Sequence, residues 1–95
     1  MRSKKRDEGL IASQILDICL RGVGKTRIIY QANLNSSKAN QYLSSMIKKG
    51  LIEEIVSGSK TLYKTTSRGT ELKQKYQQLQ SEMDELQGRI FAVEA

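Results

Sequence analysis

The 95-residue sequence contains no histidine, no proline and no tryptophan, and it has a single cysteine. A chain with one thiol cannot form a disulfide within itself, and without histidine it has few of the ligands that transition metals prefer. Four tyrosines and one phenylalanine are too few to line an aromatic pocket for a small organic ligand. We therefore expect neither a metal site nor a cofactor.

Long apolar runs are also missing. No stretch approaches the ~18 consecutive apolar residues that a membrane-spanning helix needs. The basic start, Arg2-Ser3-Lys4-Lys5-Arg6, leads into Asp7 and Glu8 and not into the apolar core of a signal peptide. We expect a cytoplasmic protein with no membrane partner.

Three motifs resemble catalytic or nucleotide-binding sites, but each lacks a required part. Cys19 has no histidine to activate it, and adjacent strand residues such as Glu53 and Glu54 point to opposite faces. The run from Gly22 to Thr26 resembles the end of a phosphate-binding loop, yet Cys19 stands where that loop needs its first glycine. The sequence therefore predicts a protein that is not an enzyme.

Positive charge is abundant and unevenly distributed. Residues 1–69 hold 13 Lys/Arg against 5 Asp/Glu, a net charge of +8, whereas residues 70–95 hold 3 against 5, a net charge of −2. A basic module on a near-neutral extension is typical of a protein that binds a polyanion, most commonly nucleic acid. The alternative is a charged surface that serves only solubility.

Apolar periodicity predicts three short helices in the first half of the chain. The first runs over residues 8–20, the second over 25–32, and the third begins at Asn35, Ser36 or Ser37 and ends near Lys49. Gly22 and Gly24 end the first helix, and Gly50 follows the third. Their expected core residues are Ile11, Ile15, Leu16, Ile18, Cys19, Ile28, Ile29, Ala32, Ala39, Leu43, Met46 and Ile47.

Two β-like runs and one long helix follow. Residues 51–56 and 61–66 favour strands joined by a turn over 57–60, and Thr66 or Ser67 can cap the final helix. Three helices, a hairpin and a long helix make a mainly α fold with a small β-hairpin (α+β), the winged helix-turn-helix arrangement. We expect a head domain over residues 1–68 and a coiled-coil helix over 69–95.

The final helix carries an unbroken heptad repeat. Apolar residues are spaced alternately by three and four, and a strict seven-residue repeat indicates a partner helix, here a second copy of the chain. Charge pairing slightly favours an antiparallel pair, although a parallel pair stays open. The repeat starts at Leu72, and the predicted dimerisation residues are Tyr76, Leu79, Met83, Leu86, Ile90 and Val93.

The third helix is the predicted reading helix for double-stranded DNA. Opposite its apolar side lie short polar side chains that can donate to and accept from base edges, namely Ser37, Asn40, Gln41 and Ser44. An ordinary solvated helix face is the alternative. No arginine lies on this side, so the commonest strong contact to guanine is absent, and we expect modest sequence discrimination.

A second set of residues is predicted to contact phosphates, and the basic start of the chain would add to it. The turn of the hairpin is only about four residues long, so we do not expect deep insertion into the minor groove. The predicted phosphate-binding residues are Lys25, Thr26, Arg27, Lys38, Tyr42, Lys48, Lys60 and Lys64.

Several runs together resemble a known family. These are Lys25–Leu34 (KTRIIYQANL), Tyr42-Leu43, Gly50-Leu51-Ile52 and Tyr63–Gly69. They are similar to the small archaeal winged-helix proteins of the Sulfolobus ten-kilodalton chromatin-associated type. The resemblance implies a homodimer joined by an antiparallel C-terminal coiled coil that binds double-stranded DNA at the nucleoid, as a transcription regulator or as a chromatin protein.

One alternative function belongs to a different class. A winged-helix head can also serve as a protein-interaction module whose basic face binds an acidic protein. Steep salt dependence of binding to duplex DNA would favour the DNA-binding hypothesis over this one, because each neutralised phosphate releases counterions.

Overall fold

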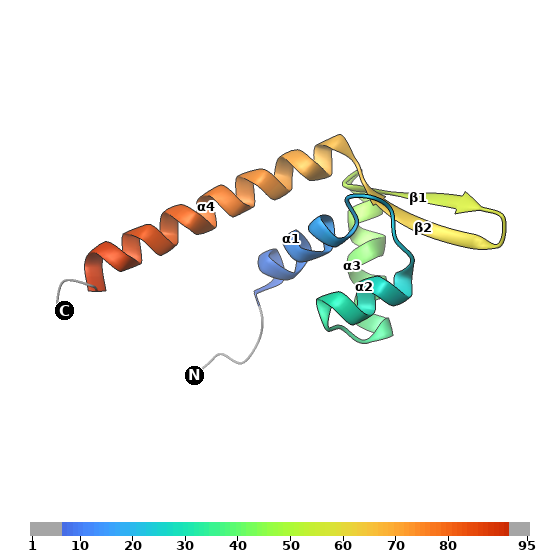
Figure 1. Cartoon of the computed structure of the whole chain (residues 1–95), viewed down its shortest axis with the longest axis horizontal. Helices are drawn as coiled ribbons and strands as arrows, with labels where there is room; N and C mark the ends of the chain where they lie inside the picture. Colours follow the sequence, from blue (N-terminus) through green and yellow to red (C-terminus); the bar gives the residue numbers. More distant parts are fainter. Residues whose placement is uncertain (1–6, 92–95) are drawn as a thin grey trace.

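The computed structural model describes residues 7–91. The basic residues Arg2 to Arg6 and the predicted dimerisation residue Val93 lie outside the described residues. Three short helices and the base of a hairpin form a head, from which the last helix extends as a rod (Figure 1). The elements are α1 (Glu8–Ile18), α2 (Lys25–Ala32), α3 (Ser36–Lys48), β1 (Ile52–Ser57), β2 (Lys60–Thr65) and α4 (Ser67–Phe91).

The predicted fold class is confirmed, and the predicted ends of α1, α2, α3, β1 and β2 agree with the observed ends to within two residues. Helix α1 stops at Ile18, two residues before the predicted Leu20, and Gly22 follows with φ of 87°. Each strand begins and ends within one residue of its predicted bounds. None of the helices within residues 7–91 is long and apolar enough to cross a membrane.

The core is built around α1, which contacts α2, β2 and α4. Ile15, Leu16 and Cys19 of this segment are almost completely inaccessible to solvent, as are Ile28 and Ile52. Burial raises the pKa of the Cys19 thiol to about 12, so this residue behaves as a small apolar side chain, as predicted. Three predicted core residues, Ile18, Ile29 and Ile47, are only half-buried.

The hairpin forms a wing that projects from the head. Strands β1 and β2 pair antiparallel from Ile52 opposite Thr65 to Ser57 opposite Lys60. Only two residues remain at the tip, where Gly58 has φ of 63°, as the first position of a type II′ turn requires. The predicted turn over 57–60 is this four-residue β-turn, and its outer residues, Ser57 and Lys60, are the last pair of the two strands. Beyond Ile52 every residue of β1 is exposed, whereas Tyr63 and Thr65 of β2 are buried, so the hairpin joins the core at its base and projects beyond it.

A single residue in the α1–α2 connection adds to the sheet. The backbone N–H of Val23 donates to the carbonyl of Tyr63 at 3.0 Å, and the N–H of Tyr63 donates to the carbonyl of Val23 at 2.7 Å. The segment with the phosphate-loop resemblance is thus the turn that attaches the wing to the helices. No local sequence pattern predicts this bridge.

Helix α4 begins at a crowded junction. The Thr65 hydroxyl donates to the carbonyl of Leu16 at 2.6 Å, and the Thr66 hydroxyl donates to the carbonyl of Gly50 at 2.6 Å. The Thr66 hydroxyl also accepts from the backbone N–H of Gly69 at 3.1 Å, which caps α4. One short segment therefore attaches the wing, the end of α3 and α1 to the start of the rod.

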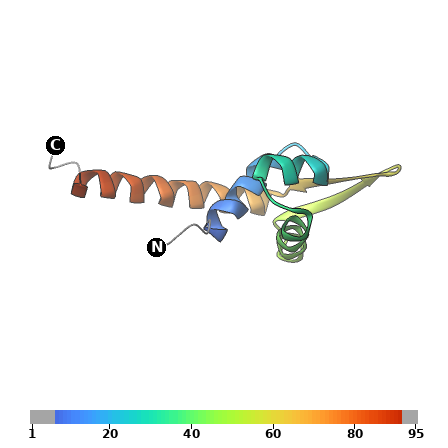
Figure 2. The same cartoon turned by 90° about the horizontal axis from the view of Figure 1, so that it is seen from below.

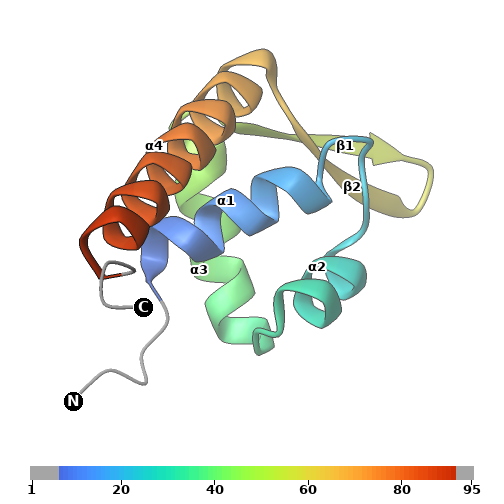
Figure 3. The same cartoon turned by 60° about the vertical axis from the view of Figure 1, so that its left-hand side comes forward.

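The first half of α4 lies against α1, as two views show (Figures 1 and 3). The Lys73 ammonium lies 3.6 Å from the Asp17 carboxylate, and the Tyr76 hydroxyl donates to Asp7 at 2.9 Å. The hydrogen bond to Asp7 is the main cause that raises the pKa of Tyr76. The contacts of the head thus continue along α4 as far as Tyr76, beyond the predicted domain boundary at residue 68.

Two glycines of α4 give opposite predictions for stability. A methyl group at Gly69 would overlap the carbonyl oxygen of Leu51 and lie 2.8 Å from Thr65 Cγ2, whereas nothing lies within 4 Å of one at Gly88. We expect Gly69→Ala to destabilise the protein by about 1–3 kcal/mol through overpacking. The matched Gly88→Ala change should stabilise it by up to about 1 kcal/mol, because alanine favours a helix.

The measurement is urea unfolding of both variants and the wild type at one protein concentration. Equal stability of Gly69→Ala and the wild type would contradict the close approach of α4 to Leu51.

Candidate nucleic-acid interface

Helix α3 protrudes from one side of the head, and the view along its axis shows it standing clear of the other helices (Figure 2). The turn before it is held by the core. Asn33 adopts the left-handed conformation with φ of 56°, and the N–H of Leu34 donates to the carbonyl of Ile29 at 3.0 Å. Because Leu34 also packs against the core, α2 fixes the direction in which α3 leaves.

Asn35 begins α3. Its side-chain oxygen accepts from the backbone N–H of Lys38 at 2.7 Å, and its own carbonyl accepts from Ala39. Of the three caps that the sequence allowed, Asn35 is therefore the one used. Ala39, Leu43 and Met46 are buried, and they turn the opposite side of the helix outward.

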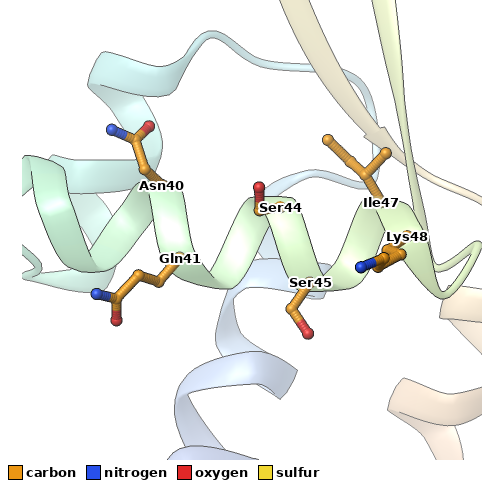
Figure 4. Close-up of a pocket in the computed structure, with 6 residues that line it drawn as sticks. All are labelled: Asn40, Gln41, Ser44, Ser45, Ile47 and Lys48. Atoms are coloured by element: carbon orange, nitrogen blue, oxygen red, sulfur yellow. The ribbon is translucent and has the colours of Figure 1, made fainter.

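The outward side of α3 lines a shallow hollow with mainly short polar side chains (Figure 4). Gln41, Ser45 and Lys48 point to one side of the helix in this view, while Asn40 and Ile47 point to the other. We define the reading face as Asn40, Gln41, Ser44, Ser45 and Lys48, all of which are exposed.

Ser45 belongs to this face but was not among the residues predicted to read bases. It follows Gln41 by four residues and precedes Lys48 by three, a spacing that places all three side chains on one side of a helix. This helical spacing was enough to predict that Ser45 lies on the reading face. Ser37, also predicted to read bases, is exposed in the first turn of α3.

The predicted phosphate-binding residues are spread over several elements. Lys38 and Tyr42 lie together in a second hollow beside Glu8 of α1, next to the reading face. Lys25 and Tyr42 are half-buried, whereas the remaining predicted phosphate-binding residues are exposed: Thr26, Arg27, Lys38, Lys48, Lys60 and Lys64.

The two lysines of the wing have different surroundings. Lys64 stands directly opposite Glu53, whose negative charge offsets part of its own. Lys60 stands opposite the uncharged Ser57 at the tip. Lys60 is therefore the stronger candidate for a phosphate contact. On β1, Glu54 lies beside Tyr63, whose pKa is raised first by burial and then by the nearby carboxylate.

The apolar repeat of α4 divides into two parts. Leu79, Met83, Leu86 and Ile90 are each more than half exposed on the rod. Tyr76 is half-buried and bonded to Asp7 of its own chain. Among the described residues, the predicted dimerisation residues that are free of the head are thus Leu79, Met83, Leu86 and Ile90.

Comparison with known proteins identifies the family to which this fold belongs. A winged helix-turn-helix family model matches residues 5–84, and the chain belongs to this family. Among solved structures it is similar to Sso10a-2, a DNA-binding protein from Sulfolobus solfataricus, with a TM-score of 0.84, 26% identity and 94% of each chain covered. The resemblance predicted from the sequence is thereby confirmed.

Two bacterial transcription regulators share the fold at 15% identity. PcaV from Streptomyces coelicolor has a TM-score of 0.77, covering 88% of this chain and 65% of its own. MepR from Staphylococcus aureus has a TM-score of 0.74, covering 87% and 62%. Among curated protein sequences, none matches this chain.

The cap of the reading helix generates a prediction. Asn35→Ala removes the acceptor for the Lys38 N–H, and we expect a loss of about 1 kcal/mol in the free energy of unfolding. Asn35→Asp keeps an acceptor at the same position and adds a charge that favours the helix N-terminus, so it serves as the matched control. Urea unfolding measures both, and a destabilised Asp variant beside an unaffected Ala variant would contradict the capping role.

Proposed function

We propose that the protein is a homodimer that binds double-stranded DNA, as a transcription regulator or as a chromatin protein. The observation that carries this proposal is the reading face, a strip of short polar side chains on a protruding helix whose other side is buried in the core. The description of Sso10a-2 as a DNA-binding protein supports it, because that similarity extends over nearly the whole chain.

In this proposal α3 lies in the major groove, where each base pair presents a distinct pattern of donors and acceptors. The amides of Asn40 and Gln41 can both donate and accept, and the hydroxyls of Ser44 and Ser45 adapt to either role. Lys38, Lys60 and Arg27 contact phosphates, which fixes the position of the helix without reading sequence. Affinity then comes mainly from charge.

The rods of two chains pair antiparallel in this proposal. Pairing Leu79 with Ile90 of the second copy, and Met83 with Leu86, covers apolar side chains that are more than half exposed in the single chain. Burial of each such side chain contributes roughly 1.5–3 kcal/mol at most. Because α4 of each chain starts at its own head, the two heads lie at opposite ends of the paired rods.

Binding to a duplex across a salt series tests the function. Lys60→Gln should lower the slope of log affinity against log salt by about one unit, because one phosphate contact is lost. Gln41→Ala should alter the preference among duplex sequences and leave that slope nearly unchanged. Absence of duplex binding at low salt would instead favour a protein-interaction module.

The dimer is tested by sedimentation. Leu79→Asp combined with Leu86→Asp should yield monomers at micromolar concentration, because burying unpaired carboxylates is costly. Gln78→Asp with Ser81→Asp adds the same charge to exposed positions of α4 outside the apolar repeat, and this control should remain dimeric. A dimeric Leu79 and Leu86 double variant would contradict pairing through the rod.

A further inference from the structure

A groove outside the predicted site lies between the end of α3 and the start of α4. Its volume is about 320 Å³, and it is open to solvent. Leu51 and Leu72 form its apolar part, and its charged lining consists of Lys49, Arg68, Lys75 and Glu71. We call it the α3–α4 groove. None of its three cations was among the predicted phosphate-binding residues.

None of the three cations forms an ion pair within residues 7–91. Within residues 7–91 the two ion pairs are Lys73 with Asp17 and Arg89 with Glu85, and neither involves the groove. Glu71 precedes Lys75 by four residues, but their charged atoms form no ion pair within 4.0 Å. With one carboxylate against three cations, the groove carries a net charge of +2.

The dipole of α4 does not account for the cation at Arg68. It is the second residue of α4, where the positive end of the helix dipole favours a carboxylate, yet the first turn has no acidic residue. The Arg68 guanidinium lies over Gly50, since a methyl group on that glycine would be 3.7 Å from Arg68 Nη1. The side chain is thus directed toward the end of the reading helix.

The groove continues a row of positive charge along α3. Lys38 of α3 and the C-cap residue Lys49 are about three helical turns apart, which places them on the same side and about 16 Å from each other at 1.5 Å per residue. The hollow containing Lys38 borders α1, and the groove containing Lys49 borders α4. Lys60 lies on the wing, a separate projection of the head (Figure 1). A helix in the major groove has a sugar–phosphate strand along each flank.

We propose that the α3–α4 groove binds the phosphate backbone of duplex DNA along the flank of α3 that faces α1 and α4. Lys49, Arg68 and Lys75 supply the charge, and Lys38 extends the contact toward the start of α3. The apolar side chains of Leu51 and Leu72 line the groove beside these charged groups. This inference rests on the proposed function and adds to it a contact with a second sugar–phosphate strand of the duplex.

The test uses the full chain and a duplex of about 30 base pairs, roughly 100 Å long at 3.4 Å per base pair. Lys49→Gln with Lys75→Gln should lower the slope of log affinity against log salt by about two units, one for each lost contact. Both residues are exposed, so the thermal midpoint should stay close to that of the wild type. Arg89→Gln, on the same helix but outside the groove, should leave the slope unchanged.

Glu71 provides a variant with the opposite sign. Removing the one carboxylate of the groove by Glu71→Gln should tighten duplex binding several-fold at low salt, because phosphate repulsion is relieved. Asp84→Asn removes the same charge from an exposed position farther along α4 and should have no comparable effect.

The outcomes separate the two proposals. A wild-type protein that binds no duplex overturns the proposed function and this inference with it. If the wild type binds and Lys60→Gln lowers the slope, but the Lys49 and Lys75 double variant retains the wild-type slope, the groove proposal alone is wrong. An unchanged affinity of Glu71→Gln would likewise overturn it.

Discussion

The close approach of α4 to the turn after α3 is the constraint on which the arrangement of the head and the rod depends. Because Gly69 has no side chain, the start of α4 can approach the carbonyl of Leu51 closely. The Thr66 hydroxyl donates a hydrogen bond to the carbonyl of Gly50 in the same turn. The reading helix, the wing and the rod all meet within this segment. A larger residue at position 69 would separate surfaces that otherwise form one rigid unit.

Local patterns were enough to predict the order and type of every element. Glycine placement and apolar spacing located α2 to the residue and α3 to within one residue of its end, because these signals act within a few residues. The Val23–Tyr63 bridge could not be predicted, since one residue pair has no periodicity. Tyr76 fits the heptad repeat, yet its hydroxyl donates a hydrogen bond to Asp7 of the same chain. Residue spacing predicts the side of a helix on which a residue lies, but not which other segment covers that side.

The same distinction applies to the candidate site. Most of the reading face follows from helical spacing along a single segment, and Ser45 could have been found in that way. The α3–α4 groove is assembled from the turn between α3 and β1 and from the first turns of α4. Its cations are separated by up to 26 positions in the sequence, and only the fold brings them together. Helical spacing therefore predicts the part of the site that lies on a single helix, but not the groove that several segments form together.

The continuity of α4 has a mechanical consequence. One uninterrupted helix runs from the junction at Ser67 to the exposed apolar repeat, so a rotation at one end of this helix turns the other end with it. Each residue of an α-helix advances by about 1.5 Å and turns by about 100°. Inserting one residue between Tyr76 and Leu79 would therefore hardly lengthen the molecule, but it would rotate the reading helix by more than a quarter turn about the rod axis. The number of residues between the head and the apolar repeat therefore sets the direction in which the reading helix points about the rod axis.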